Sequence, residues 1–188
     1  MNDFLKEFEQ IKSNESINHY LFKNVFHPLP ELKAFTDYVE FSKIKGNYRC
    51  DTEGLYILHA DPQVDDLSSF LGIQDLRKKV KQIYGDEIDS VGVSFILSEF
   101  KDGEIPTRTG ITKHYDQQDT LHWGCIGTSH WEIWSDDPDQ IECEYVIEPG
   151  DIIFTRKHTT HHVKTLSSPR GSCILTMHKD GVTEYGRK

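Results

Sequence analysis

The stretch that decides the fold lies at residues 113–176, and four segments within it give the pattern. Residues 113–116 read KHYD, residues 148–154 read EPGDIIF, residues 158–162 read HTTHH, and residues 169–176 read PRGSCILT. Short runs rich in β-branched and aromatic residues recur here at intervals of about ten residues, separated by turn-forming triplets such as Pro-Gly-Asp. Many short strands punctuated by turns predict a small β-barrel or β-sandwich.

The first part of the chain has apolar residues at helical rather than strand spacing. Between residues 73 and 83, isoleucine, leucine and valine fall on one stripe, and Gly85 follows where a helix C-cap is expected. Similar stripes predict a helix over residues 3–12, with Asp3 as its N-cap, and a second over residues 32–39. Helices followed by many strands indicate a mainly β fold that N-terminal helices buttress.

We therefore predict a single domain over residues 1–188. Within it, residues 1–85 form a helical N-terminal support, and residues 90–178 form the β core. The predicted strands cover residues 54–60, 91–97, 120–126, 130–134, 142–147, 152–154, 161–166 and 172–178.

Composition narrows the class of protein. No apolar run approaches the roughly 18 residues of a membrane span, and the N-terminus lacks the layout of a signal peptide. A formal net charge of −10 disfavours a nucleic-acid partner, because phosphate binding draws on clustered lysine and arginine. The four cysteines form no CxxC pair, which predicts reduced thiols.

We expect a cytoplasmic protein that acts on a small molecule or a protein side chain. The basic run at residues 156–158 could meet an anionic substrate or could simply be solvated.

His114 and Asp116 are two residues apart, so on an extended strand both would face the interior, with Tyr115 outside. A surface pair arising by chance is the simpler interpretation in a chain with 10 histidines and 31 acidic residues. The histidine cluster at residues 158–162 favours a site, because a returning strand can bring a distal imidazole to the pair. Two imidazoles and one carboxylate leave coordination positions open, as in non-haem Fe(II) oxygenases.

Arg170 and Ser172 are also two apart, so a guanidinium and a hydroxyl would share one face of a strand. Together they could bind one carboxylate, because the planar fork of arginine matches it bidentately and stays charged. An arginine at the edge of the turn formed by residues 167–169 is the competing interpretation.

This set of residues resembles the Fe(II)/2-oxoglutarate-dependent oxygenases, whose core is a double-stranded β-helix of jelly-roll or cupin-like type. The resemblance covers residues 90–178. It implies that His114, Asp116 and His161 ligate Fe(II) at the catalytic centre, that Arg170 pairs with the far carboxylate of 2-oxoglutarate, and that Ser172 hydrogen-bonds it. It further implies a dioxygenase that uses O2 and converts 2-oxoglutarate to succinate while it oxidises a substrate.

Residues 113–134 are also similar to the JmjC-type cupin branch, with one departure. That branch places a 2-oxoglutarate-binding lysine about where this chain has Ser129. The departure favours Arg170 as the anchor, with His122 and Lys164 next in line to hold the carboxylate.

Only one of the adjacent histidines 161 and 162 can face the interior, since neighbouring strand residues point to opposite faces. Apolar Val163 shares a face with His161, and charged Lys164 shares one with His162, so we predict His161 to be the inward residue. Its distances along the sequence from Asp151 and Arg170 agree with the branches that the chain resembles.

Two other functions remain open from the residues. One is a cupin-like metal-binding or ligand-binding protein without redox turnover. The other is a zinc-dependent hydrolase or isomerase built on His158, His161 and His162, which would leave Arg170 unexplained. Trp123, Trp131 and Tyr115 are candidates for packing around the cavity, although core filling is the favoured role for each of them.

Overall fold

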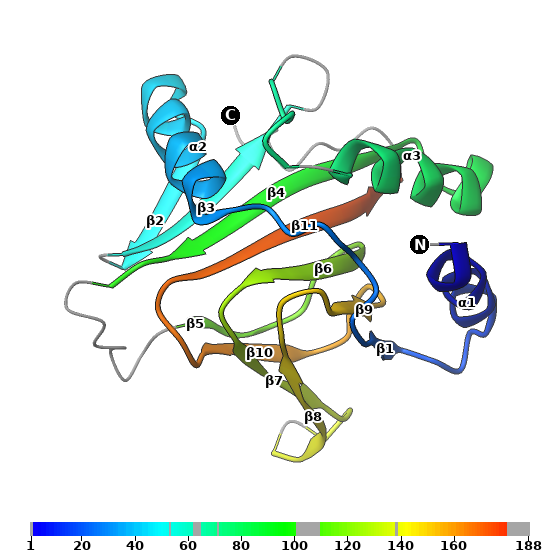
Figure 1. Cartoon of the computed structure of the whole chain (residues 1–188). Coiled ribbons are helices and arrows are strands. Elements are labelled where there is room, and N and C mark those ends of the chain that lie inside the picture. The colour runs from blue at the N-terminus through cyan, green and yellow to red at the C-terminus, as the bar shows by residue number, and fades with distance from the viewer. Residues whose placement is uncertain are drawn as a thin grey trace.

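The computed structural model describes residues 2–52, 54–61, 65–70, 72–100, 110–137 and 139–179. Its strands form two antiparallel sheets that face each other (Figure 1). The larger sheet has the order β1-β9-β6-β11-β4-β3-β2, and the smaller sheet has the order β5-β10-β7-β8. Eight strands make the core: β4 (Ser90–Ser98), β5 (Gly110–His114), β6 (Asp119–Ile126), β7 (Ser129–Trp134), β8 (Ile141–Ile147), β9 (Ile152–Thr155), β10 (His161–Thr165) and β11 (Arg170–His178).

Four of these eight strands lie in each sheet, and the chain crosses repeatedly from one sheet to the other. Strands β4, β6, β9 and β11 lie in the larger sheet, and β5, β7, β8 and β10 lie in the smaller one. This arrangement is a double-stranded β-helix, a form of jelly roll. It confirms the predicted fold class, including its mainly β character.

Three further strands extend the larger sheet at both edges: β1 (His19–Phe22), β2 (Tyr48–Thr52) and β3 (Leu55–Ala60). Of these, the sequence predicted only β3. Strand β1 pairs with β9 and β2 pairs with β3, both as short edge strands. A short edge strand shows little alternation of apolar and polar residues. Pairing with the neighbouring strand, rather than the local sequence pattern, therefore decides that it forms.

The helices are α1 (Asn2–Ser13), α2 (Leu32–Lys45) and α3 (Ile73–Tyr84). Gly85 ends α3 as predicted, with its N–H bonded to the carbonyl of Lys81. Helix α1 begins one residue early, so Asp3 lies in its first turn rather than at the N-cap. Helix α2 runs past its predicted end and stops at Gly46, whose φ of 74° suits a residue without a side chain.

The main hydrophobic core lies between the helices and the outer face of the larger sheet (Figure 1). Phe8 and Phe35 from the helices meet Phe95, Trp123 and Leu175 from the sheet. A smaller cluster lies between the two sheets and contains Trp131, Ile133, Ile147, Ile153 and Val163. The space between the sheets is therefore filled with apolar side chains at its β8–β9 end.

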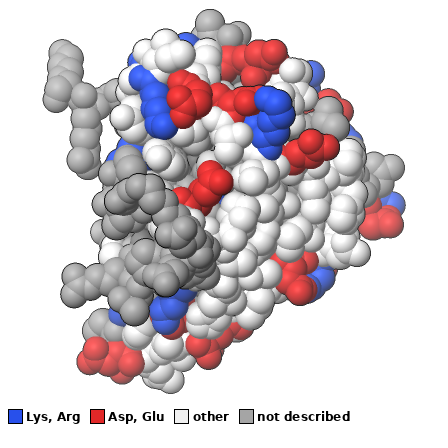
Figure 2. Space-filling model, turned by 60° about the vertical axis from the view of Figure 1, so that its left-hand side comes forward, with Lys and Arg blue, Asp and Glu red and all other residues white. Residues whose placement is uncertain are grey.

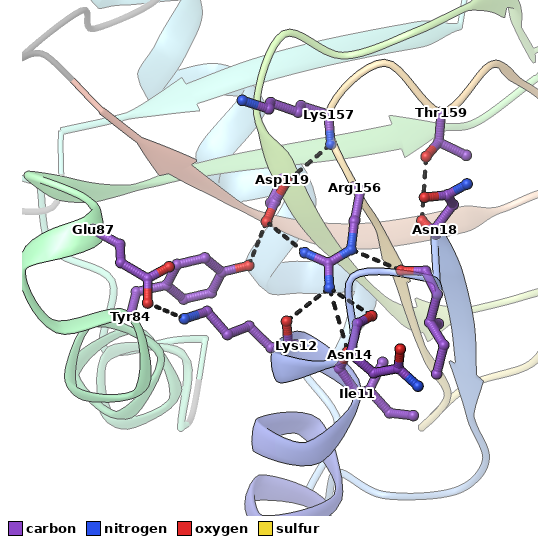
Figure 3. Close-up of polar contacts among 11 residues, drawn as sticks. Ile11, Lys12, Asn14, Asn18, Tyr84, Glu87, Asp119, Arg156, Lys157 and Thr159 are labelled. Atoms are coloured by element: carbon purple, nitrogen blue, oxygen red, sulfur yellow. Dashed lines mark hydrogen bonds and ion pairs between the residues drawn. The ribbon is translucent and has the colours of Figure 1, made fainter.

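Arg156 ties α1 to the β core (Figure 3). Its Nη2 donates to the carbonyls of Lys12 and Asn14 at 2.7 and 3.0 Å, and its Nε donates to the carbonyl of Ile17 at 2.7 Å. The guanidinium thus satisfies carbonyls at the C-terminal end of a helix, where positive charge is favourable. Its Nη1 also lies 3.9 Å from Asp119. The Arg156 guanidinium is therefore used largely within the fold, and an anionic partner for the basic run at residues 156–158 stays a prediction.

Charged side chains of both signs are interspersed on the face shown in Figure 2. Lysine and arginine do not gather there into one continuous area among the residues that are coloured. Within the described ranges, no helix has both the length and the apolar character needed to cross a membrane.

Candidate functional site

His114, Asp116 and His161 converge at the open end of the space between the sheets. One ligand atom from each lies within 4.8 Å of the others. His114 Nε2 is 3.9 Å from Asp116 Oδ1, and His161 Nε2 is 3.8 Å from Asp116 Oδ2. Strand pairing accounts for the convergence, because His161 on β10 lies directly opposite His114 on β5.

Both histidines are oriented by hydrogen bonds from the far side of the ring. His114 Nδ1 lies 2.7 Å from the carbonyl oxygen of Thr112, and His161 Nδ1 lies 2.9 Å from that of Thr159. A carbonyl only accepts, so Nδ1 carries the proton in each ring and Nε2 presents a lone pair toward Asp116. This arrangement of a second partner is typical of histidines that bind metals.

Burial keeps His161 neutral. Its side chain is 1% exposed and stacks on Trp131, with ring centroids 5.1 Å apart. Burial, and to a smaller extent the charge of His114, lowers the pKa of His161 to about 4. Nε2 of His161 is buried and makes no hydrogen bond to any described residue. A neutral imidazole with a buried free lone pair is suited to a cation.

Asp116 is placed differently from the prediction. Strand β5 ends at His114, so Asp116 lies in the loop that follows rather than on the strand. The loop is held because the carbonyl of Asp116 accepts the N–H of His158 at 2.8 Å. Burial raises the pKa of Asp116, and the neighbouring His114 opposes that effect.

Tyr115 faces solvent, as predicted, with 52% of its surface exposed. It therefore does not pack around the cavity.

His161 and His162 lie on opposite faces of β10, as predicted. His162 Nδ1 is 3.0 Å from Glu132 on the outer face of the smaller sheet. His158 Nε2 lies 3.3 Å from Gln117. The three histidines of the proposed zinc site therefore do not converge, which removes the structural basis for that alternative.

Arg170 and Ser172 share the inner face of β11, and both are 3% exposed. Nη1 of Arg170 is buried and has no hydrogen-bond partner in the part of the chain that the structure describes. Burial lowers the pKa of Arg170 to about 10. On the other face of the strand, Gly171 lies against the ring of Phe35, where an added Cβ would come within 3.0 Å. The β11 backbone thus packs tightly on α2 while its polar side chains point inward.

His122 is a site residue that the sequence analysis did not place in the constellation. It lies on β6, is 6% exposed, and its Nε2 is 4.0 Å from Asp116 Oδ2. Both of its ring nitrogens are buried without a hydrogen-bond partner among the described residues. Burial lowers its pKa well below the usual value, and the charges of His161, Arg170 and His114 add to that effect. The only sequence signal was a lone histidine at an inward position of a predicted strand.

A cavity of about 320 Å³ opens beside these residues. His114, Asp116 and His122 line it at one end, and Arg49 and His59 line it toward β2 and β3. Apolar wall comes from isoleucines of β3, β4, β5 and β11: Ile57, Ile96, Ile111 and Ile174. A larger groove of about 670 Å³ runs along Lys113 and Trp134, but the converging ligands do not line it.

A second group of possible metal ligands lies on the outer face of the smaller sheet. Glu132 is bonded there to Lys164 and to His162, and His130 Nε2 lies 3.2 Å from Glu144. Each carboxylate already has a cationic or imidazole partner, so the group is satisfied as a network of ion pairs and hydrogen bonds.

The remaining predicted residues divide between the cavity and the core. Trp131 lies against both His161 and His122, so it supports the site. Trp123 packs against Phe26 in the core below the helices. Ser129 is buried and accepts a hydrogen bond from Trp131 Nε1 at 3.2 Å.

No family model matches the sequence, and no curated protein matches it. The structure is similar to that of the Escherichia coli ribosomal oxygenase YcfD in complex with cobalt and 2-oxoglutarate, with a TM-score of 0.64 and 13% identity. The match covers 94% of this chain and 52% of that one, so this chain spans about half the length of YcfD.

It is also similar to a Pseudomonas putida prolyl-4-hydroxylase, with a TM-score of 0.61 and 14% identity. That match covers 94% of this chain and the whole of the other. Identities this low establish the architecture alone. The chain therefore has the fold of the cupin-like 2-oxoglutarate oxygenases, a mainly β double-stranded β-helix buttressed by helices.

Proposed function

We propose that this protein is an Fe(II)- and 2-oxoglutarate-dependent oxygenase. The observation that carries the proposal is the combination of an open His114-Asp116-His161 group with a buried arginine that lacks a carboxylate partner within the described residues. The likeness of the fold to two oxygenases supports the same conclusion.

The three side chains fit a divalent iron. Two neutral imidazoles and one carboxylate form a facial set with open positions, which suits non-haem Fe(II). The Nε2 atoms of His114 and His161 are directed toward Asp116 by the Nδ1 hydrogen bonds described above. His114, Asp116 and His161 would therefore hold the metal, and the carboxylate would neutralise part of its charge.

Arg170 and Ser172 fit the carboxylate of a co-substrate. A buried guanidinium without a counter-charge is costly, so a ligand that brings an anion to it gains strongly. Ser172 offers a hydroxyl on the same face of β11. A five-carbon dicarboxylic keto acid has one carboxylate for Arg170 and a keto-acid group for the metal.

The chemistry supplied by the bound groups is oxidative: Fe(II) with O2 converts 2-oxoglutarate to succinate and CO2 while it oxidises the substrate. The protein's own part is to bind, orient and exclude water. Trp131 holds the His161 ring in place, and the hydrogen bond to Thr159 fixes its tautomer. The isoleucine wall of the cavity keeps that side of the site dry.

The substrate is a small molecule or a protein side chain that enters the cavity. A volume of about 320 Å³ is at the lower end of the range for ligand pockets, so it admits a modest group rather than a large polycyclic compound. Arg49 and His59, at the end toward β2 and β3, offer polar contacts to it.

One assay tests the proposal. Anaerobic protein loaded with Fe(II) is titrated with 2-oxoglutarate, then exposed to O2, and succinate is measured. We expect saturable 2-oxoglutarate binding and slow succinate release even without a substrate. The Asp116→Ala variant should lose the metal, and with it both signals.

The outcomes separate the competing functions. Metal binding without any affinity for 2-oxoglutarate would identify a cupin-like binding protein. Binding of 2-oxoglutarate that is unaffected by Asp116→Ala would place its site elsewhere and refute the proposal.

A further inference from the structure

His122 is the least satisfied polar side chain at the site. Its imidazole is 6% exposed, and neither ring nitrogen makes a hydrogen bond within the described ranges. A buried polar group without a partner is disfavoured, and an apolar residue would fill the same volume against Trp131 without that cost. The position therefore indicates a missing partner, and it lines the same cavity as His114 and Asp116.

The location of His122 defines where that partner must be. Its Nε2 is 4.0 Å from Asp116 Oδ2, so the ring borders the metal end of the cavity. On the sheet, His122 pairs with Ile174 of β11, four residues along the strand from Arg170. Four residues of a strand span roughly 13 Å, so Arg170 lies along β11 from the metal end of the cavity.

His122 thus borders a molecule that binds the metal from the side of this cavity. As a neutral imidazole it has one N–H donor and one acceptor nitrogen. The oxygens that such a molecule presents beside the metal are those of its keto-acid end. An N–H directed there makes a charge-assisted hydrogen bond with a carboxylate.

We infer that His122 is a co-substrate-binding residue, whose ring N–H donates to the keto-acid end of 2-oxoglutarate while Arg170 holds the opposite carboxylate. The inference rests on the proposed function. It assigns the two ends of the co-substrate to different side chains, one on β6 and one on β11.

The two assignments are separated by comparing 2-oxoglutarate with succinate. Both molecules carry a carboxylate for Arg170, but succinate lacks the keto-acid group. Binding of each is measured by calorimetry to Mn(II)-loaded protein without O2, so the readout does not depend on turnover. The variants are His122→Phe, which keeps a ring against Trp131, and His122→Gln, which returns an amide N–H near the position of Nε2. His162→Ala, which removes an imidazole from the opposite face of the smaller sheet, is the matched control.

We expect His122→Phe to weaken 2-oxoglutarate binding by about 10- to 100-fold, the loss of a hydrogen bond to a charged group. Succinate affinity should change by less than about twofold, an effect too small to count as a lost hydrogen bond. His122→Gln should recover part of the 2-oxoglutarate affinity, and His162→Ala should bind both as the parent does. Arg170→Ala, in contrast, should weaken both ligands.

Three results would overturn the inference. The first two leave the proposed function intact, and the third refutes it as well. If His122→Phe and the parent bind 2-oxoglutarate equally, His122 does not contact it, although the proposed function stands. If His122→Phe loses Mn(II) as Asp116→Ala does, His122 is a metal ligand. If the parent itself fails to bind 2-oxoglutarate, the proposed function is wrong and the inference fails with it.

Discussion

At the scale of single residues, buried polar atoms without partners mark the site. Nε2 of His161, Nη1 of Arg170 and both ring nitrogens of His122 are buried and unbonded among the described residues. Each is an atom type that binds a cation or an anion. Native interiors satisfy most such atoms internally, so these atoms on β6, β10 and β11 indicate ligands that complete them.

Arg170 should matter for binding and not for stability. We expect Arg170→Ala to weaken 2-oxoglutarate binding by about 2–5 kcal/mol, because a buried charged pair loses one partner. Arg170→Lys should restore only part of that, since an ammonium lacks the planar fork. Metal affinity should stay unchanged. Because the guanidinium is buried without a counter-charge, Arg170→Ala should be at least as stable as the parent to urea when no ligand is present.

Calorimetry and urea unfolding check these statements. Equal affinity in parent and Arg170→Ala would move the carboxylate site to another residue. Lys164 does not face the cavity to bind this carboxylate, because its ammonium is paired with Glu132 on the outer face of the smaller sheet. His122 would then be the remaining candidate.

The two adjacent histidines of β10 offer a matched pair. His161→Ala should lose metal and succinate formation, because the buried Nε2 beside Asp116 is removed. His162→Ala removes a contact to Glu132 on the opposite face and should keep most of both. Metal content by elemental analysis and succinate release are the measurements. The reverse pattern would mean that the ligand is His162 and that β10 presents its other face to the cavity.

At the scale of elements, α1 depends on one side chain from the β core. Arg156 donates to several carbonyls at the end of α1 and in the following loop. We expect Arg156→Ala to lower the free energy of unfolding by about 1–3 kcal/mol, the range for hydrogen bonds to a charged group. For a domain of this size, that shifts the Tm by roughly 2–10 °C. Thermal unfolding measures the change.

Lys157→Ala is the control for this prediction. Lys157 is exposed, and its backbone N–H donates a hydrogen bond to Asp119, which the substitution leaves in place. Its Tm should match that of the parent. An Arg156→Ala variant as stable as Lys157→Ala would show that apolar contacts of Phe4 and Phe8, not the guanidinium, hold α1.

At the scale of the whole molecule, ligand binding and stability are linked. A ligand that binds only the folded state at 100 times its Kd adds about 2.7 kcal/mol to the free energy of unfolding. We expect Mn(II) to raise the Tm of the parent by roughly 5–10 °C and to leave Asp116→Ala unchanged. In Mn(II)-loaded protein, 2-oxoglutarate should raise the Tm further, and a chelator should reverse both shifts. If 2-oxoglutarate raised the Tm by the same amount without metal, the metal and 2-oxoglutarate would not share one site.

The sequence by itself determined the β core and the faces of its strands. Alternation along β10 predicted that His161 faces inward and His162 outward, because strand side chains alternate strictly. On β11, the polar residues Arg170 and Ser172 share a face, which the same rule predicted. Spacing within one strand is local information, so it can be read without knowing what lies opposite.

The tertiary structure decided the contacts that join distant segments. It put Asp116 beyond the end of β5, where His158 holds its backbone, and it paired β1 with β9. It directed Arg156 to the end of α1 rather than to a ligand. It also placed His122 of β6 beside Asp116, which lies in the loop between β5 and β6, although the two residues are only six apart and the spacing did not indicate the contact. The physical reason is the same in each case: a local pattern reports which face is buried, whereas the partner across the cavity comes from another part of the chain.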